Sequence, residues 1–172
     1  MALRERTGRP QRGEVQDDLI KKLVEIRRVA KVVKGGRTMR FSALVVVGNG
    51  AGEVGVGIGK SAEVPDAIEK ATQEAKKRMV KISVLERTIP HETVGVFGRG
   101  RVILLPGALG SGVIAGGPVR SVLEACGIKD IRTKSIGSNN KINVVKATLA
   151  GLTSLRTVEQ VAAVRNKAPE EI

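Results

Sequence analysis

The chain has 172 residues, of which 41% are hydrophobic, so it is long enough for one ordinary domain or two small ones. Thirty Lys and Arg residues against 17 Asp and Glu residues give a formal net charge of +13, which predicts a polyanionic partner, with nucleic acid as the first candidate. No stretch approaches the ~20 apolar residues of a spanning helix, and the Arg-rich N-terminus has no apolar signal core, so we expect a cytoplasmic protein without a membrane partner.

Three scarce residue types narrow the function further. Phe41 and Phe97 are the only aromatic residues, so base stacking on exposed rings cannot dominate, and folded RNA bound by its backbone and shape fits better than loose single strands. Cys126 is the only cysteine, expected as a small buried apolar residue, and His91 is the only histidine. These counts exclude an intrachain disulfide, a thiolate-rich zinc site and a His-based triad, so we predict no catalytic residues, no metal site and no cofactor.

The first half of the chain predicts an arm and a sheet. Residues 1–16 are polar, rich in Gly and Arg and without periodicity, which predicts a flexible basic arm. Residues 19–33 have apolar residues at helical spacing but are rich in β-branched residues toward their end, so periodicity alone leaves helix and strand open. The Gly35-Gly36 pair predicts a hairpin or loop tip, followed by a buried strand from Thr38 to Val47.

A glycine-rich stretch comes next. Residues 48–52 predict a turn, after which Val54, Val56 and Ile58 alternate with three glycines. This predicts a strand with one bare face, to which another backbone or a bulky partner comes close. A helix is expected from Val64 to Val80, with an apolar stripe along one side. The stripe consists of Val64, Ala67, Ile68, Ala71, Ala75 and Met79.

The second half predicts a separate unit, and we divide the chain into 1–16, 17–81, 82–155 and a C-terminal tail at 156–172. Strands are expected at 83–89 and 101–105 with the basic sequence FGRGR between them, and a third strand at 128–136. Residues 106–117 form a glycine-rich loop before a short helix from Pro118 to Cys126. Asn139 or Asn140 is expected to cap a helix at 142–152, and a short helical stretch is expected at 158–164.

The strongest functional signal is a run of cations without acids. Between Ile26 and Gly52 there is no Asp or Glu, which predicts contact with RNA phosphates in preference to a merely solvated strand face. If all the cations of this run met phosphates, the log-log salt slope of binding would be about −4 to −5. The cations are Arg27, Arg28, Lys31, Lys34, Arg37 and Arg40.

Three glycine motifs resemble those of enzymes, but none meets the requirements of the site that it resembles. Residues 50–55 match G-x-G-x-x-G, yet the third glycine enters an alternating strand where a dinucleotide site needs a helix. The run ending at Gly59-Lys60-Ser61 has Val54 where a P-loop requires glycine, so Lys60 is better interpreted as an RNA contact. PGALGSGVIAGG, residues 106–117, resembles the phosphate loop of small-molecule kinases, but no acidic cluster is available for magnesium.

Four segments together resemble the bacterial small-subunit ribosomal protein five family, over residues 17–166. They are KVVKGGR, SALVVVGNGAGEVGVGIGKSAEVPDAIEKA, VIAGGPVRSVLEACGIKDI and INVVKATLAGL. The resemblance implies an α+β fold: a double-stranded-RNA-binding-like β-β-β-α domain and a C-terminal β-α-β domain with a left-handed crossover. It also implies that residues 19–33 form a strand.

The resemblance further implies the partners and the site residues. The loop at Lys31 to Arg37 would reach small-subunit ribosomal RNA near the spectinomycin site and the head-body junction. Gly35 and Gly36 would let the backbone of the loop approach the RNA closely. Residues 110–120 would face small-subunit protein four, where Gly110, Gly112 and Arg120 would influence decoding accuracy. Small-subunit protein eight and the channel through which messenger RNA enters would also lie nearby. The remaining expected RNA contacts are Arg27, Arg28, Lys60, Arg99 and Arg101.

These expectations define a structural constituent of the small ribosomal subunit that supports assembly, is not an enzyme and does not form a homo-oligomer. Two alternatives remain open. A free-standing regulator that binds double-stranded RNA would use the first unit and leave the second unexplained. A small-molecule kinase-like enzyme would use the glycine loop at residues 106–117.

Overall fold

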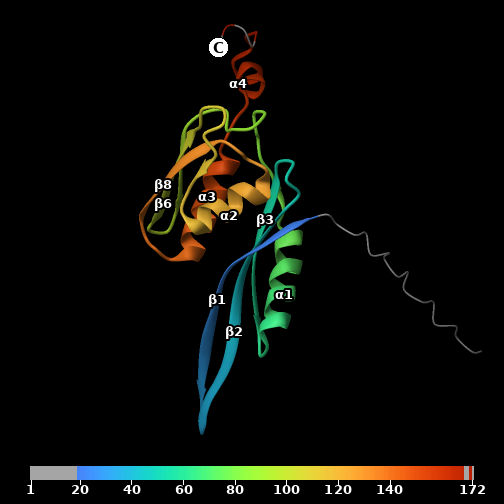
Figure 1. The fold of residues 1–172 in the computed structure, drawn as a ribbon, viewed down its shortest axis with the longest axis vertical. Helices are drawn as coiled ribbons and strands as arrows, with labels where there is room; N and C mark the ends of the chain where they lie inside the picture. Colours follow the sequence, from blue (N-terminus) through green and yellow to red (C-terminus); the bar gives the residue numbers. More distant parts are fainter. Residues whose placement is uncertain (1–18, 169–170, 172) are drawn as a thin grey trace, which may run out of the picture.

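The computed structural model describes residues 19–168 and 171, so the predicted basic arm at residues 1–16 lies outside the described residues. The chain forms two α+β units, each built on a four-stranded sheet. The hairpin between the first two strands projects from one end of the molecule, and the last helix lies at the opposite end (Figure 1).

The N-terminal unit is an antiparallel sheet in the order β1-β2-β3-β4, covered on one face by a helix. The segment that periodicity left ambiguous is a strand, as the resemblance implied, and the predicted β-β-β-α order is confirmed. β4 is a further short strand that pairs with the start of β3. The elements are β1 Ile20–Val33, β2 Gly36–Gly48, β3 Glu53–Ser61, α1 Val64–Lys77 and β4 Val80–Lys81.

The bare face of β3 is where α1 packs, which confirms the close approach predicted from the alternating glycines. A Cβ added to Gly57 would lie 2.0 Å from the carbonyl oxygen of Ala71, a distance that no side chain can occupy. The facing residues of α1 are fully buried alanines, so helix and strand meet backbone to backbone. The glycines are Gly55, Gly57 and Gly59, and the alanines are Ala67, Ala71 and Ala75.

The C-terminal unit is a mixed sheet in the order β5-β6-β8-β7. β7 and β8 run parallel and are joined through α2, which gives the expected β-α-β unit. Asn140 is the capping residue of α3, since its side chain accepts a hydrogen bond from the N–H of Ile142 at 3.2 Å. The elements are β5 Thr93–Phe97, β6 Gly100–Pro106, β7 Val113–Ile114, α2 Gly117–Cys126, β8 Ile131–Gly137, α3 Lys141–Thr153 and α4 Val158–Arg165.

Several predicted elements need correction. The strand expected at 83–89 is wrong: only Leu85 and Thr88 form an isolated bridge, because they close a tight turn on each other. The sequence FGRGR is not a loop throughout, since Phe97 ends β5 and Gly100 begins β6. α1 ends at Lys77 instead of Val80, because Val80 and Lys81 pair with β3. The third strand begins at Ile131 instead of residue 128, because the N–H groups of Gly127 and Ile128 bond to carbonyls at the C-terminal end of α2.

The two units share one hydrophobic core. Leu44, Val46 and Val54 of the first sheet belong to the same buried cluster as Val122 and Leu123 of α2. The glycine turn at residues 48–52 lies against the end of α2, where the N–H groups of Gly50 and Gly52 donate to the carbonyls of Ala125 (3.0 Å) and Cys126 (2.9 Å). The α2 side of this contact is equally tight, because a Cβ on Gly127 would lie 2.0 Å from the carbonyl oxygen of Gly50.

Candidate nucleic-acid interface

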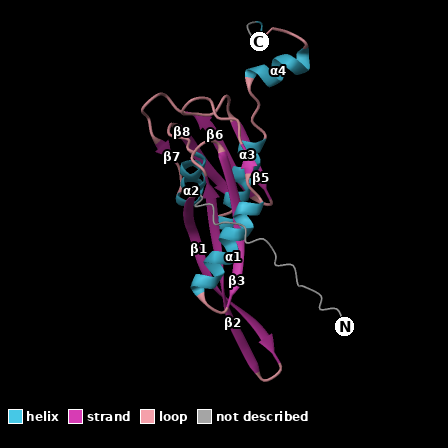
Figure 2. Cartoon of the chain, turned by 90° about the vertical axis from the view of Figure 1, so that its right-hand side faces the viewer, coloured by secondary structure: helices cyan, strands magenta, loops and turns pink. Residues whose placement is uncertain are grey.

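The end of the β1–β2 hairpin stands free of the rest of the sheet. β3 pairs with β2 only between Phe41 and Gly48, whereas the pairing of β1 with β2 continues to Val33 and Gly36. Residues 29–40 are therefore a two-stranded ribbon, and Figure 2 shows it continuing past the end of α1. Except for the half-buried Val29, every ribbon residue is exposed, so the ribbon contributes little to the core and is available to a partner.

Lys34 and Gly35 form the turn of the ribbon, as the glycine pair predicted. Val33 pairs with Gly36 on either side of them. Gly35 has a φ of +87°, in the left-handed region that a side chain disfavours, whereas Gly36 has no such value. A Cβ at either glycine would meet no atom within 4 Å, so the space around this tip is open. Backbone conformation explains Gly35, but nothing in the free chain requires glycine at position 36.

The cations of the hairpin are distributed over both faces. Residues that pair directly across strands share a face, so Lys31 with Thr38 and Val29 with Arg40 lie on one face. Arg27, Ser42 and Lys60 form one row across three strands on that same face, which is the face turned away from α1. Val32 with Arg37 and Arg28 with Phe41 lie on the other face. The sequence did not show this division, because it follows from the register.

Most of these cations have no acidic partner, but one does. Arg27 Nε lies 2.8 Å from an Oε of Glu25, so the expectation that all six cations are unopposed is wrong for Arg27. Lys141 of α3 lies 3.2 Å from the other oxygen of Glu25. Burial tends to raise the pKa of Glu25, but the hydrogen bonds from Arg27 and Lys141 outweigh it and hold this pKa below its ordinary value. The cations without an ion pair among the described residues are Arg28, Lys31, Lys34, Arg37 and Arg40.

Arg99 and Arg101 lie apart from the ribbon. Arg99 lies in the β5–β6 turn of the C-terminal unit and Arg101 near the start of β6, where both line a pocket of 540 Å³ together with Ile136 and Gly137. Gly98 of this turn lies beside Asn143 in α3, and α3 is tied to β1 through the ion pair of Lys141 with Glu25. The two arginines thus form a second basic surface, on the C-terminal unit and separate from the ribbon.

The predicted protein-interface residues come together around one loop. Gly110 and Gly112 lie between β6 and β7 with φ values of +81° and +72°, and a Cβ on either would meet no atom within 4 Å. Arg120 reaches back from α2 and donates to the carbonyl of Val113 at 3.2 Å. Sequence reasoning missed Asp130, whose carboxylate accepts a hydrogen bond from the N–H of Gly112 at 2.9 Å. No spacing signal points to it, because the contact joins segments far apart in the chain.

The two nucleotide-binding motifs weighed at residues 50–61 lack the helix that such sites need. Gly55 enters β3 and opens no helix, and Gly59, Lys60 and Ser61 end a strand, so neither nucleotide-binding motif has its helix N-terminus. His91 is held by backbone groups: its ring contacts the carbonyl of Glu92 at 2.8 Å and the N–H of Arg156 at 3.3 Å. Within residues 19–168 and 171, no group of three or more His, Cys, Asp or Glu side chains is placed to hold a metal ion.

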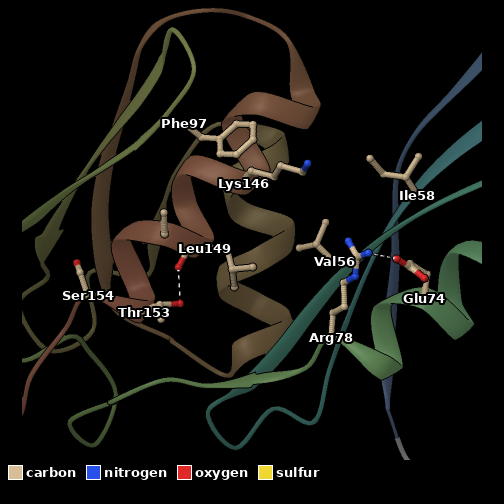
Figure 3. A pocket seen from close by; sticks show the side chains of 10 residues that line it. Val56, Ile58, Glu74, Arg78, Phe97, Lys146, Leu149, Thr153 and Ser154 are labelled. Atoms are coloured by element: carbon tan, nitrogen blue, oxygen red, sulfur yellow. Dashed lines mark hydrogen bonds and ion pairs between the residues drawn. The ribbon is translucent and has the colours of Figure 1, made fainter.

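The groove between the two units, shown in Figure 3, has a volume of 590 Å³. Val56 and Ile58 form one wall, and Leu149 of α3 forms part of the other. Several of its polar side chains have partners: Arg78 lies 2.7 Å from Glu74, the Lys146 ammonium lies 4.8 Å from the centre of the Phe97 ring, and Thr153 donates to a backbone carbonyl of α3. The groove offers no free set of catalytic groups, which leaves the ribbon as the principal candidate site.

Comparison with known families agrees with this geometry. The family model described as "Ribosomal protein S5, N-terminal domain" matches residues 19–83, which include the whole ribbon. The model described as "Ribosomal protein S5, C-terminal domain" matches residues 95–165. Together they cover most of the chain. The chain belongs to the ribosomal protein S5 family.

Members of the S5 family are structural constituents of the small ribosomal subunit that bind ribosomal RNA and neighbouring ribosomal proteins. Membership agrees with the presence of an exposed basic ribbon on a well-packed α+β body, because cations attract the phosphates of ribosomal RNA. Among the described helices, none is both long and apolar enough to cross a lipid bilayer.

Proposed function

We propose that the ribbon binds small-subunit ribosomal RNA by entering a crevice whose phosphates lie on both of its sides. The observation that carries this proposal is the register, which divides exposed cations between the two faces with Lys34 at the tip. A flat RNA surface could neutralise only one face, whereas a groove or a junction of helices offers phosphates to both. Contacts of this kind position the protein without reading base edges, which agrees with the absence of aromatic residues from the ribbon.

The individual contacts follow from the placement of the residues. Arg27, Lys31 and Lys60 contact phosphates on the face turned away from α1, and Arg28 and Arg37 contact phosphates on the opposite face. Gly35 and Gly36 let RNA approach the backbone of the tip. Arg99 of the β5–β6 turn and Arg101 of β6 provide a second, separate contact. The ribbon lies near the spectinomycin site and the head-body junction of the subunit.

The second half of the proposal concerns proteins. The loop that holds Gly110 and Gly112, together with Arg120, faces small-subunit protein four and biases the subunit between open and closed arrangements, which influences decoding accuracy. The C-terminal unit also contacts small-subunit protein eight, near the channel through which messenger RNA enters. The chain acts in the cytoplasm, as a single copy in each particle, by binding and without making or breaking a bond.

The test of the RNA proposal is the salt dependence of binding. The full chain and its Lys34→Ala/Arg37→Ala variant are titrated into small-subunit particles depleted of this protein, at several salt concentrations. If both side chains meet phosphates, the log-log slope of the variant is less steep by about 1.4 to 1.8. Arg165→Ala/Lys167→Ala is the matched control, since it removes equal charge from exposed residues at the other end of the molecule. A slope for Lys34→Ala/Arg37→Ala equal to that of the wild-type chain would remove these two side chains from the RNA contacts.

A second measurement separates this function from a free-standing regulator of double-stranded RNA. A constituent of the particle stays with the small subunit during sedimentation through sucrose at high salt. Loss of the chain from the particle under these conditions, together with tight binding to free double-stranded RNA, would favour the regulator.

A further inference from the structure

The segment from Pro106, the last residue of β6, to Gly112 is closely packed at Gly107, where an added Cβ would lie 2.7 Å from the backbone nitrogen of Ile131, but not at Gly110 or Gly112. Gly110 and Gly112 both have positive φ with open space around them, and Leu109 between β6 and Gly110 is 80% exposed. Within the loop, the N–H of Ser111 donates to the carbonyl of Ala108 at 3.0 Å. One such bond is too little to hold an exposed glycine-rich segment in a single conformation, because glycine has the most backbone freedom to lose.

A buried carboxylate supplies the missing restraint. Asp130 is 1% exposed, and its Oδ1 accepts the N–H of Gly112 at 2.9 Å. The N–H of the next residue, Ile131, donates to the carbonyl of Gly112 at 3.1 Å. Gly112 is therefore held on both its N–H and its C=O by the start of β8. A hydrogen bond to an ionised acceptor is stronger than one between neutral groups, so this contact is a firm restraint.

The turn at residues 85–88 completes the arrangement. Arg87 Nε lies 3.0 Å from the Oδ2 of Asp130, an oxygen that receives no hydrogen bond of good geometry. The carbonyl of Arg87 accepts the N–H groups of Lys129 and Asp130 at 2.9 and 3.0 Å. Thr88 accepts the N–H of Gly107 through its hydroxyl at 3.2 Å, at the other end of the loop. Both ends of the loop are thus tied to this turn or to the residue that it positions.

The described hydrogen bonds and ion pairs of the Asp130 side chain all go to loop segments, since Gly112 and Arg87 are its partners. A buried charge is costly unless it is paired, and here the pairing holds a loop whose exposed residues contribute little to the core. A carboxylate at this position is therefore better explained by the shape of the loop than by the packing of the body. Arg120 borders the same loop through its bond to Val113.

We propose that Asp130, oriented by Arg87, is the positioning residue that fixes the loop from Pro106 to Gly112 in the shape presented to its protein partner. Leu109 is the side chain that the loop displays, and Leu85, which is 58% exposed, lies with it beside a small hollow of 80 Å³. The partner surface then offers an apolar pocket to Leu109. This inference rests on the proposed function, because that proposal places a protein partner at this loop.

The first test uses the free full-length chain and needs no partner. Amide hydrogen exchange at Gly112 is followed by NMR in the wild type, Asp130→Ala, Asp130→Asn and Arg87→Ala. Removal of the acceptor in Asp130→Ala exposes the Gly112 amide and speeds its exchange about tenfold or more, whereas asparagine keeps an Oδ1 acceptor and retains most of the protection. Arg87→Ala, which leaves the carboxylate in place, gives an intermediate rate even if Asp130→Ala fails to fold. Unchanged exchange in both alanine variants overturns the inference.

The second test measures the affinity of the same chains, and of Leu109→Ala, for purified small-subunit protein four. Asp130→Ala and Leu109→Ala weaken binding about tenfold or more, and Asp130→Asn restores most of the affinity. Tight binding by wild type and Asp130→Ala alike overturns the inference and leaves the proposed interface intact. Absence of any complex with the wild-type chain refutes the interface itself, and the positioning role is then decided by the exchange at Gly112 alone.

Discussion

Single residues in this chain are glycine for two different reasons, which the structure separates. At Gly35 the backbone requires it, because φ is +87° and the surrounding space is open. At Gly57 the space requires it, because a Cβ would lie 2.0 Å from a helix carbonyl. Sequence alone predicted that both positions were special, the first as a hairpin tip and the second as a bare strand face. The sequence could not tell whether backbone conformation or lack of space requires the glycine, because these two causes differ only in φ and in the neighbouring atoms of another element.

The tip of the ribbon gives a prediction at this scale. Gly35→Ala places a side chain at positive φ and destabilises the turn by about 1 kcal/mol, whereas Gly36→Ala leaves the free chain unchanged. Both variants weaken binding to depleted small-subunit particles if RNA approaches the backbone closely at the two glycines. Amide exchange of residues 33–36 in the free chain and titration of the particles provide the two readouts. Full affinity of Gly36→Ala would show that RNA does not touch the backbone there.

Asp130 gives a second prediction, in its dependence on pH. The N–H of Gly112 holds the pKa of the Asp130 carboxyl below its ordinary value; burial opposes this, and Gly110 and Arg87 contribute further lowering. A lowered pKa stabilises the folded chain above the unfolded value of about 3.9, and that stabilisation is lost as pH falls through the folded pKa. Urea denaturation should therefore show the wild type losing its advantage over Asp130→Asn as the pH is lowered from about 5 through and below the unfolded value. A constant difference over this range would contradict the prediction.

Among the elements, β3 and α1 show what sequence patterns predict well. Alternating glycines predicted a close approach to β3 and an apolar stripe predicted the packed side of α1, and the two patterns face each other. Elements whose identity depends on a distant partner were predicted less well. The apolar residues at 83–89 resemble a strand, but the backbone of Arg87 bonds to residues 129 and 130 and that of Leu85 to Thr88. β5 was missed because Gly95, which breaks its apolar pattern, is needed for contact with α3.

The glycine stripe gives a prediction at the scale of the element. Gly57→Ala forces α1 away from β3 and lowers the free energy of unfolding by at least about 2 kcal/mol. Gly117→Ala, at the first position of α2, is the control, because a Cβ there meets no atom within 4 Å and φ is not positive, so its effect stays within about 0.5 kcal/mol. The midpoints of urea denaturation provide the comparison. Equal midpoints for the two variants would mean that α1 can shift without cost.

For the whole molecule, the decisive feature is the core that continues from the first sheet into α2. The sequence suggested a division near residue 82, and the family models divide the chain close to it, the first ending at residue 83 and the second beginning at residue 95. Neither the sequence pattern nor the limits of the family models show that the glycine turn at 48–52 contacts the end of α2, because no sequence pattern links these two segments. The predicted domain boundaries remain predictions, since one packed interior crosses the division.

This shared core predicts that both units unfold together. Phe41 lies in the first sheet and Phe97 in the second, so fluorinated phenylalanine gives one ¹⁹F signal from each unit. The two signals should change at one denaturant concentration. Gly127→Ala combines a φ of +91° with a clash at Gly50. It should lower the free energy of unfolding by about 2 to 4 kcal/mol and move both midpoints to the same lower denaturant concentration. A shift of the Phe97 signal alone would show two independent units.

The position of β1 at the edge of its sheet has a consequence for the chain before it reaches the ribosome. A strand of 14 residues with a free edge is a template on which a second copy could pair and begin to aggregate. The exposed cations of the ribbon oppose this by mutual repulsion, and the register shift between Leu23 and Glu25 interrupts a regular edge. The same charges should therefore keep newly made copies apart, and RNA bound as proposed above would neutralise them and end the repulsion.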